Sequence, residues 1–490
     1  MKYKEVITMT LLDNIKKEQN YTLTENDALA LNSTSDALVD LFAISGAMRE
    51  REDQEITALF AKAMVEDKLT ATKLAFYTRD VRGGLGERRT GRLMLKYLAE
   101  NYPDIFRKNL EYVADYGRWD DLVYLLDSAA DVVVPLLKKQ LDEDLAGMKE
   151  MKPVSLLAKW LPSVNTSNKD TVRKGRFLAK QFNMSEKEYR KTLAALRNYL
   201  NVVETDMSAN RFEDIVYPEV PSKAMNNYRN AFRRHDEERF SDFLNKVEKG
   251  EEKINSSVLY PYDIVEKYLY HSNGVDKVLE EQWKALPNYV EGENNFLVMA
   301  DVSGSMYGRP MATSVGLAMY FAERNKGPFA NTFMTFSERP ELVTIKGENL
   351  FEKIRYIQNA NWAMNTNLEA AFRLLLYTAV KYKTPKEEMP SSIVVITDME
   401  IDRCVSGGWL FYDMMKKQFE DSGYEMPNVV FWNVNSRHNT YHASFDRKGV
   451  QLASGQSTTV FESLVKGISL TPYEYMLSVL NTERYERITV

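Results

Sequence analysis

The hydrophobic pattern of the chain changes near residue 290, and this change limits the possible folds more than any other feature. Before residue 290, apolar residues recur every three or four positions, as on one face of a helix. The clearest such stretches are 36–48, 55–66, 92–100, 121–126 and 131–147. Many consecutive helices with little strand signal predict an α-solenoid or a large helical bundle.

Beyond residue 290, short apolar runs alternate with helical patterns. Phe296–Ala300 is the continuous apolar run that a buried parallel strand needs. Further strands are expected at 331–336, 341–345, 392–397 and 428–434, and helices at 311–325, 366–381, 409–420 and 460–468. This alternation predicts an α/β domain with a mainly parallel sheet. We therefore expect a helical domain over residues 1–290 and an α/β domain over 291–490.

Composition excludes several classes of protein. The chain has 490 residues, of which 44% are apolar and 27% charged, as in ordinary soluble globular proteins. The single cysteine, Cys404, cannot form an internal disulfide and fits a reducing compartment, so we expect a cytoplasmic protein. No apolar run is long enough to span a membrane, and the first 20 residues lack the pattern of a signal peptide.

Positive charge is concentrated in two stretches, although the whole chain carries a net charge of −6. Residues 152–197 hold 11 basic and 3 acidic side chains, a net charge of +8. Residues 73–92 hold 6 basic and 2 acidic side chains, a net charge of +4. Local potential attracts a polyanion such as a nucleic acid, whatever the net charge. Solvated helix faces are the alternative, and the more common origin of such stretches.

A row of oxygen-bearing side chains directly follows the first predicted strand. Asp301, Ser303 and Ser305 alternate along the chain, so they can turn their oxygens toward one point. Ligands bind beyond the carboxyl ends of strands in open α/β sheets. One carboxylate and two hydroxyls suit a hard cation such as Mg²⁺ or Ca²⁺. Thr366 and Asp398 lie where later strands should end and offer further oxygen ligands.

A metal site is favoured over a helix cap or a catalytic site at this motif. Residues 301–306 could form only a turn and a helix cap, because Asp and Ser are good capping residues. A nucleophilic Ser303 or Ser305 would need a nearby base, and no histidine stands in a recognisable triad context. His438 and His442 are four residues apart, but their segment has the composition of a loop rather than of a zinc-binding helix. We therefore do not expect an enzyme.

The set Asp301, Ser303, Ser305, Thr366 and Asp398 resembles the metal-ion-dependent adhesion site of the von Willebrand factor A domain. This resemblance implies a doubly wound α/β fold that binds Mg²⁺ or another divalent cation such as Ca²⁺ or Mn²⁺. It implies that the two serines and Thr366 hold the ion directly, and that Asp301 and Asp398 do so directly or through water. An open coordination position would accept a carboxylate or another anion of a partner.

The helical half carries motifs of its own. Residues 76–89 (FYTRDVRGGLGERR) form a glycine-rich stretch framed by arginines, which can bind phosphates. A helix–helix turn whose charges pair with neighbouring residues is the favoured alternative. Residues 116–122 (YGRWDDL) and 159–163 (KWLPS) follow. Together with the A-domain motif, these stretches resemble the Ro/TROVE family of RNA-binding proteins, and more closely a bacterial and phage branch of unknown function.

The Ro/TROVE resemblance implies HEAT-like helical repeats that can close into a ring, with the A domain bridging its ends. Single-stranded RNA ends would enter the basic hole, and structured small RNAs would bind outside. The stretch 165–197 is then the main RNA-contact candidate, and its charged candidates are Lys169, Arg173, Lys174, Arg176 and Lys180. Arg118 and Lys159 are secondary candidates. Trp119 and Trp160 could stack on bases, although tryptophan is more often a core residue.

Two functions follow from these features. The first is a non-enzymatic RNA-binding protein that takes small noncoding or defective RNA. The second is a scaffold whose A domain grips an acidic residue of a partner protein through Mg²⁺. We expect neither DNA nor a membrane as a partner.

Overall fold

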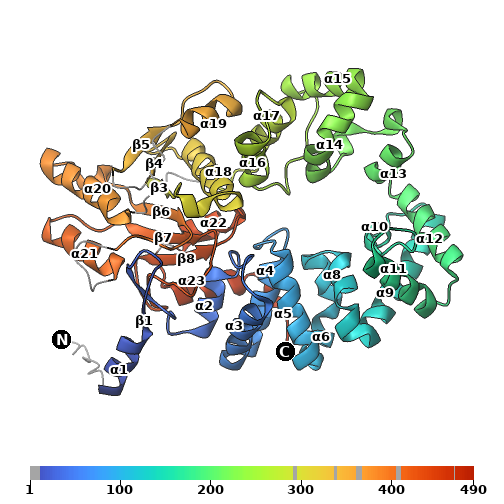
Figure 1. Cartoon of the computed structure of the whole chain (residues 1–490), viewed down its shortest axis with the longest axis horizontal. Coiled ribbons are helices and arrows are strands. Elements are labelled where there is room, and N and C mark those ends of the chain that lie inside the picture. The colour runs from blue at the N-terminus through green and yellow to red at the C-terminus, as the bar shows by residue number, and fades with distance from the viewer. Residues whose placement is uncertain (1–10, 291–294, 336–338, 360–366, 404–409, 468) are drawn as a thin grey trace. The chain divides into compact units, whose positions relative to one another are not determined.

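The computed structural model describes residues 11–290, 295–335, 339–359, 367–403, 410–467 and 469–490. The chain is mostly helical and forms two compact units (Figure 1). The sheet unit comprises residues 1–51, 289–347 and 352–479, and the helical unit comprises residues 52–288, 348–351 and 480–490. No helix in the described ranges is both long and apolar enough to cross a membrane.

The helical unit is built from short helices joined by tight connections. Its helices are α3 (Asp53–Glu66), α4 (Lys68–Arg79), α5 (Arg88–Asn101), α6 (Pro103–Asn109), α7 (Val113–Tyr116), α8 (Trp119–Tyr124), α9 (Leu126–Lys149), α10 (Leu157–Trp160), α11 (Lys169–Gln181), α12 (Glu186–Tyr199), α13 (Val203–Ser208), α14 (Ser222–His235), α15 (Glu237–Glu248), α16 (Pro261–Tyr270), α17 (Lys277–Lys284) and α24 (Glu483–Glu486). Three 3-10 turns, η1 (Leu110–Tyr112), η2 (Phe212–Asp214) and η3 (Tyr217–Glu219), lie between them.

Local sequence explains where several of these helices begin. The side chains of Asp67 and Asn168 accept hydrogen bonds from backbone N–H groups in the first turns of α4 and α11. Ser185 and Glu188 form a reciprocal capping box at the start of α12. These caps satisfy N–H groups that have no partner inside the helix.

The sheet unit combines strands with covering helices. Its elements are α1 (Leu11–Asn20), β1 (Tyr21–Leu23), β2 (Leu29–Leu31), α2 (Ala37–Ile44), β3 (Phe296–Ala300), η4 (Gly304–Met306), α18 (Arg309–Arg324), β4 (Thr332–Thr335), β5 (Glu341–Thr344), α19 (Leu350–Gln358), α20 (Leu368–Tyr382), η5 (Lys386–Glu388), β6 (Ser392–Thr397), α21 (Phe411–Asp421), β7 (Asn428–Asn433), β8 (Val450–Ser454), α22 (Thr459–Lys466) and α23 (Pro472–Leu480). The first residues of α19 and the last residue of α23 belong to the helical unit.

The main sheet has six strands in the order β5-β4-β3-β6-β7-β8. Among the described strand pairs of this sheet, the β4–β5 pair alone is antiparallel. All five strands expected from the sequence are present, so the α/β organisation beyond residue 290 is confirmed, with a mixed rather than a wholly parallel sheet. Because β3 and β6 are parallel neighbours, with Ala300 opposite Ile396, the residues that follow them lie side by side.

The two units are discontinuous in sequence, which differs from the expected division into residues 1–290 and 291–490. The segment before residue 52 is bonded to the sheet unit. Leu31 and Tyr441 exchange two backbone hydrogen bonds, and the Arg51 side chain donates to the Ser436 carbonyl and the Asn439 side chain. The last residues of the chain belong to the helical unit. An amphipathic pattern predicts a helix at 36–48, but no pattern in the sequence shows which unit either end segment joins.

Candidate functional site

The predicted oxygen cluster forms at the carboxyl ends of β3 and β6. Asp301 is buried, and one of its carboxylate oxygens accepts the Thr397 hydroxyl at 2.6 Å while the other accepts the Ser303 N–H at 2.9 Å. The hydroxyl oxygens of Ser303 and Ser305 lie 3.1 Å apart. Three of the five candidate ligands are therefore gathered in one turn, as their alternation in the sequence predicts.

Asp398 brings a second buried carboxylate toward this turn. Burial, together with repulsion from Asp398, raises the pKa of Asp301 to about 7. The same electrostatic repulsion would be relieved by a bound cation. The sequence predicted this proximity from the strand ends alone, and the parallel β3–β6 pairing accounts for it.

Asp398 already has one cationic partner, Arg437, which follows β7. One guanidinium nitrogen of Arg437 lies 2.9 Å from an Asp398 carboxylate oxygen and 2.9 Å from a Glu25 carboxylate oxygen. The Arg437 side chain therefore bridges the carboxylate of the candidate metal site and the N-terminal segment of the sheet unit. No feature of the sequence singled out Arg437, because its partners lie 39 and 412 positions away.

The donor set at this turn fits a divalent cation of the Mg²⁺ type. It offers two carboxylates and two hydroxyls, which are hard oxygen ligands. Thr366, the fifth candidate ligand, lies outside the described residues. Within the described part of the chain, no group of three or more His, Cys, Asp or Glu side chains is placed to hold a metal ion. Binding here would depend on the serine hydroxyls, and the ion would have to displace the Arg437 guanidinium from Asp398 or share the carboxylate with it.

The two histidines weighed as a zinc pair do not converge. His442 is buried, with Nε2 3.0 Å from the Met399 carbonyl, and burial lowers its pKa to about 4. His438 is exposed and lies 3.1 Å from a Glu25 carboxylate oxygen. Their side chains have separate surroundings, so the structure gives no support to a zinc site built on this pair.

The most basic stretch of the sequence folds into α10, α11 and α12 of the helical unit. Its charged candidates differ in their surroundings. Arg173 pairs with Asp127 at 3.0 Å and with Asp170 at 2.7 Å. Lys174 lies within 3.6 Å of the same two carboxylates. These four side chains form one ion-pair cluster, so the positive charge of Arg173 and Lys174 is largely balanced.

Three other candidates on this stretch are exposed. Arg176 pairs with Glu186 at 3.0 Å across the connection between α11 and α12. Lys169 and Lys180 have no ion-pair partner among the residues that the structure describes. A shallow pocket near the start of α11 is lined by Lys169, Arg173 and Arg176. Among these five candidates, the charge that is free to meet a polyanion therefore lies mainly on Lys169 and Lys180.

The secondary candidates meet at one tryptophan. The Arg118 guanidinium lies 5.1 Å from the centre of the Trp160 ring and the Lys159 ammonium lies 6.0 Å from it. Lys159 also pairs with Glu204 at 3.5 Å. Trp160 and Trp119 are both half-buried rather than fully enclosed. Trp160 is thus a ring at the edge of a cavity that two cations contact, in the geometry of a cation–π interaction.

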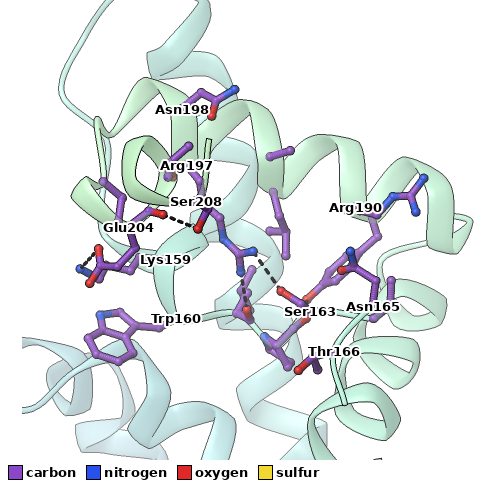
Figure 2. Close-up of a pocket in the computed structure, with 18 of the residues that line it drawn as sticks. Lys159, Trp160, Ser163, Asn165, Thr166, Arg190, Arg197, Asn198, Glu204 and Ser208 are labelled. Carbon is purple, nitrogen blue, oxygen red and sulfur yellow. Dashed lines mark hydrogen bonds and ion pairs between the residues drawn. The ribbon is translucent and has the colours of Figure 1, made fainter. Parts of the chain in front are cut away.

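This cavity is hollowed among α10, α11, α12 and α13 and measures about 800 Å³. Figure 2 shows Arg197 reaching from α12 to the segment that follows α10, with Lys159, Trp160 and Glu204 on one side and Arg190 and Asn165 on the other. Arg190 and Arg197 were not among the candidate residues, although both belong to the basic stretch. The sequence signal that could have found them is their spacing of seven, which places them on one helix face.

Backbone contacts hold the wall of this cavity in place. The Tyr189 hydroxyl donates to the Pro162 carbonyl at 3.1 Å. A Cβ on Gly175 would lie 2.9 Å from the same carbonyl oxygen, so only glycine lets α11 approach this segment so closely. The connection that follows α10 is therefore fixed by α11 and α12 together.

The arginine-framed turn after α4 has the structural role that we favoured. Arg79 pairs in the interior with Asp121 at 2.7 Å. Asp80 is buried and accepts from Arg484 and from the Tyr485 hydroxyl near the end of the chain. The turn thus fastens other parts of the helical unit, and its arginines are not gathered as a phosphate site.

Comparisons with known proteins follow the two halves of the sequence. The family described as "Domain of unknown function (DUF2828)" matches residues 24–132 and 130–295. The family described as "Domain of unknown function (DUF7788)" matches residues 295–483. An uncharacterized protein, L728, of Acanthamoeba polyphaga mimivirus is 28% identical over 503 aligned positions, which cover 94% of this chain and 87% of the viral protein.

A solved structure is similar over most of its length. It is the Ro (RSR) protein of Deinococcus radiodurans, which is 13% identical with a TM-score of 0.47, and the match covers 91% of this chain and 99% of that one. The match to the first family extends over more than half of the chain. The chain therefore belongs to the family described as domain of unknown function DUF2828.

Proposed function

We propose that this chain is a non-enzymatic RNA-binding protein of the Ro-like type that acts in the cytoplasm. Its ligand would be small noncoding or misfolded RNA with a single-stranded end. The observation that carries the proposal is the clustering of unbalanced positive charge on α11 and α12. Lys169, Lys180 and Arg190 are exposed there without an ion-pair partner among the described residues.

Phosphate binding is favoured by surface cations that no carboxylate of the protein neutralises. Binding a nucleic-acid backbone releases counterions, which favours association and makes it sensitive to salt. Cations already paired with carboxylates, such as Arg173 and Lys174, gain less because the carboxylates also repel phosphate. The motifs that resemble the Ro/TROVE family support RNA as the polyanion. On the same resemblance, the helical unit would be HEAT-like and the sheet unit would be a von Willebrand factor A-like domain.

The first experiment is to purify the tagged full-length protein from its native host in Mg²⁺ and to sequence the RNA that co-purifies. We expect a small set of short RNAs to be enriched over a mock purification. The test variant is Lys169→Glu/Lys180→Glu, which reverses two exposed charges and breaks no ion pair among the described residues. The enriched RNAs should be lost from this variant.

The matched control is Lys62→Glu/Arg234→Glu, which reverses two exposed cations elsewhere on the helical unit. This control should retain the enriched RNA. An absence of RNA above the mock level in the unmodified protein would overturn the proposal. Equal loss from both double variants would show that only the total charge of the protein matters, which would remove α11 as the binding surface.

A second function is favoured by the oxygen cluster at the ends of β3 and β6. We propose that Asp301, Ser303, Ser305, Thr366 and Asp398 bind Mg²⁺ and that the ion grips an acidic residue of a partner protein. The donor set described above supports this proposal.

Ser303→Ala/Ser305→Ala removes two hydroxyl ligands while keeping both carboxylates in place. Titration calorimetry with Mg²⁺ should show binding to the unmodified protein and at least about tenfold weaker binding to this variant, because losing even an outer-shell partner of a metal ligand costs about that much. Equal affinity would overturn the assignment.

A further inference from the structure

The cavity among α10, α11, α12 and α13 holds positive charge that the protein itself does not neutralise. Arg197 projects into it and is half-buried. Its three hydrogen-bond partners are all uncharged: the Ala158 carbonyl at 2.8 Å, the Leu161 carbonyl at 2.8 Å and the Ser163 hydroxyl at 3.0 Å. A partly buried guanidinium without a carboxylate is uncommon, because burial disfavours the charged form. Burial accordingly lowers the pKa of Arg197 from its usual range.

The acidic side chain that lines the cavity, Glu204, already has a cationic partner. Glu204 pairs with Lys159 at 3.5 Å, and its other carboxylate oxygen accepts the Tyr228 hydroxyl. The charges of Lys159 and Glu204 therefore offset each other. Arg190 and Arg197 remain as the two charges of the lining that no carboxylate of the described residues balances. The cavity as a whole is suited to an anion.

Arg190 provides the second cationic position and is free to move. Its side chain is exposed and has no hydrogen-bond or ion-pair partner among the described residues. Residues seven apart on a helix lie on one face, two turns or about 10 Å apart. Figure 2 shows Arg190 and Arg197 on separated parts of the cavity lining. Each of these two arginines can meet a different phosphate of a polymer, whereas a single small anion would reach only one of them.

The rest of the lining suits the uncharged parts of a nucleotide. Asn165 and Asn198 are exposed amides that can both donate and accept hydrogen bonds, as the edge of a base requires. Trp160 offers an aromatic surface at the edge of the cavity. Pockets of about 300–1,000 Å³ hold most small ligands, so a cavity of about 800 Å³ has room for a nucleotide.

We propose that this cavity binds one nucleotide of a single-stranded RNA, with the flanking phosphates beside Arg190 and Arg197. The inference rests on the proposed RNA-binding function and deepens it, because it separates a site that seats an individual nucleotide from the exposed lysines of α11. Single-stranded RNA presents unstacked bases that such a pocket can take, whereas duplex RNA does not.

The test measures binding of a fluorescein-labelled 12-nucleotide oligo(U) RNA to the full-length protein by anisotropy at several salt concentrations. Arg190→Ala removes a side chain that makes no hydrogen bond or ion pair among the described residues, so the fold should be kept. We expect Arg190→Ala to weaken binding about tenfold, as for loss of one charge-assisted hydrogen bond. The slope of log K against log salt should become about 0.7 less steep, the amount expected for one phosphate contact on a single strand.

Two further variants keep the test decisive. Asn198→Ala removes an amide of the lining and should weaken binding without changing the salt slope. Arg234→Ala removes an exposed arginine of α14 outside the cavity and should leave both affinity and slope near those of the unmodified protein. Melting curves of all variants verify that they are folded.

The outcomes separate this inference from the proposed function. If the RNA binds and Lys169→Glu/Lys180→Glu weakens it while Arg190→Ala and Asn198→Ala do not, the cavity is not the nucleotide site and the RNA-binding function stands. If the RNA does not bind to the unmodified protein, both proposals are overturned. A parallel titration with 5′-AMP distinguishes a free nucleotide from a chain: binding of 5′-AMP as tight as that of the RNA would overturn the two-phosphate arrangement.

Discussion

Asp121 shows how one buried side chain can organise several helices. Its carboxylate accepts from the Arg79 Nε at 2.7 Å, from the Arg92 Nε at 2.6 Å and from the Arg118 backbone N–H at 2.9 Å. The side chains of Asp121 and Arg79 are almost fully enclosed. Arginines that could be taken for phosphate ligands in the sequence are thus used to join α4, α5 and α8.

Asp121→Ala should strongly destabilise the helical unit, because it leaves the Arg79 guanidinium buried without a counter-charge. Breaking a buried pair by removing one partner costs about 3–5 kcal/mol. Urea denaturation followed by circular dichroism measures this loss. Arg89→Ala is the matched control, since Arg89 pairs with Asp53 at the surface, where such pairs contribute less than about 1 kcal/mol. Equal stability of the two variants would contradict the role of Asp121.

Arg437 is expected to compete with a metal ion for Asp398. Its guanidinium occupies one carboxylate oxygen at 2.9 Å, so the ion must displace it or share the carboxylate. Arg437→Ala should therefore bind Mg²⁺ more tightly than the unmodified protein, by about tenfold if one charge-assisted hydrogen bond is removed from competition. Titration calorimetry measures the affinity.

The control for Arg437→Ala is Arg447→Ala, which removes an arginine of the same unit that pairs with Asp413 instead. Its affinity for Mg²⁺ should be unchanged. Weaker Mg²⁺ binding by Arg437→Ala would mean that Arg437 orients Asp398 for the ion rather than competing with it.

At the scale of elements, the sheet unit depends on a close approach between α2 and β8. The Gly46 N–H donates to the Ser454 hydroxyl at 3.0 Å. A Cβ on Gly46 would lie 2.7 Å from backbone atoms of Gly455, too near for any side chain. The glycine at position 46 therefore lets the end of α2 lie against β8, the last strand of the sheet, 408 positions later in the sequence.

Gly46→Ala should push α2 away from β8 and destabilise the sheet unit. Inserting a methyl group into a closely packed contact typically costs about 1–3 kcal/mol. Thermal unfolding followed by calorimetry detects the loss. Gly274→Ala is the control, because a Cβ at Gly274 meets no atom within 4 Å. An unchanged melting temperature for Gly46→Ala would show that the two elements can separate without cost.

Elements with a strong local signal were predictable, and those stabilised by distant contacts were not. Phe296–Ala300 and 392–397 are predominantly apolar, and both are strands. β8 (Val450–Ser454) was not predicted, because its sequence, VQLAS, has only one β-branched residue and no aromatic residue. Gln451 is nevertheless buried, since its amide donates to the Gly467 and Leu470 carbonyls. These hydrogen bonds to residues outside the strand offset the free-energy cost of burying the amide N–H groups of Gln451.

At the scale of the whole molecule, the helical unit includes the far end of the chain. Tyr485 is buried and stacks on Tyr116, with ring centres 5.6 Å apart. Arg484 pairs with Asp80, and the Asn109 side chain donates to the Thr489 carbonyl at 2.6 Å. Residues brought together from distant positions of the sequence complete the packing around α4 and α7.

Truncation after Leu480 should destabilise the helical unit. It removes Arg484 and Tyr485, whose side chains donate hydrogen bonds to the buried Asp80 carboxylate. It also exposes the ring of Tyr116. We expect a loss of about 2–4 kcal/mol, below that of a fully enclosed pair because Arg484 is partly exposed. Chemical denaturation measures it, and the control is Arg107→Ala, which breaks surface pairs with Asp104 and Asp131 and should cost less than about 1 kcal/mol. A truncated protein as stable as the full chain would refute the role of this segment.

The sequence by itself determined the helical character before residue 290, five strands after it and the oxygen-bearing turn from Asp301 to Ser305. These features arise from local periodicity and from strand ends, which a linear sequence records. Only the tertiary structure decided which charges are balanced. Arg173 is paired while Arg190 is not paired within the described residues, and Arg437 meets Asp398, because the energy of a charge depends on neighbours that the fold brings from distant positions. The division into two units was decided in the same way, by contacts between the two ends of the chain and its middle.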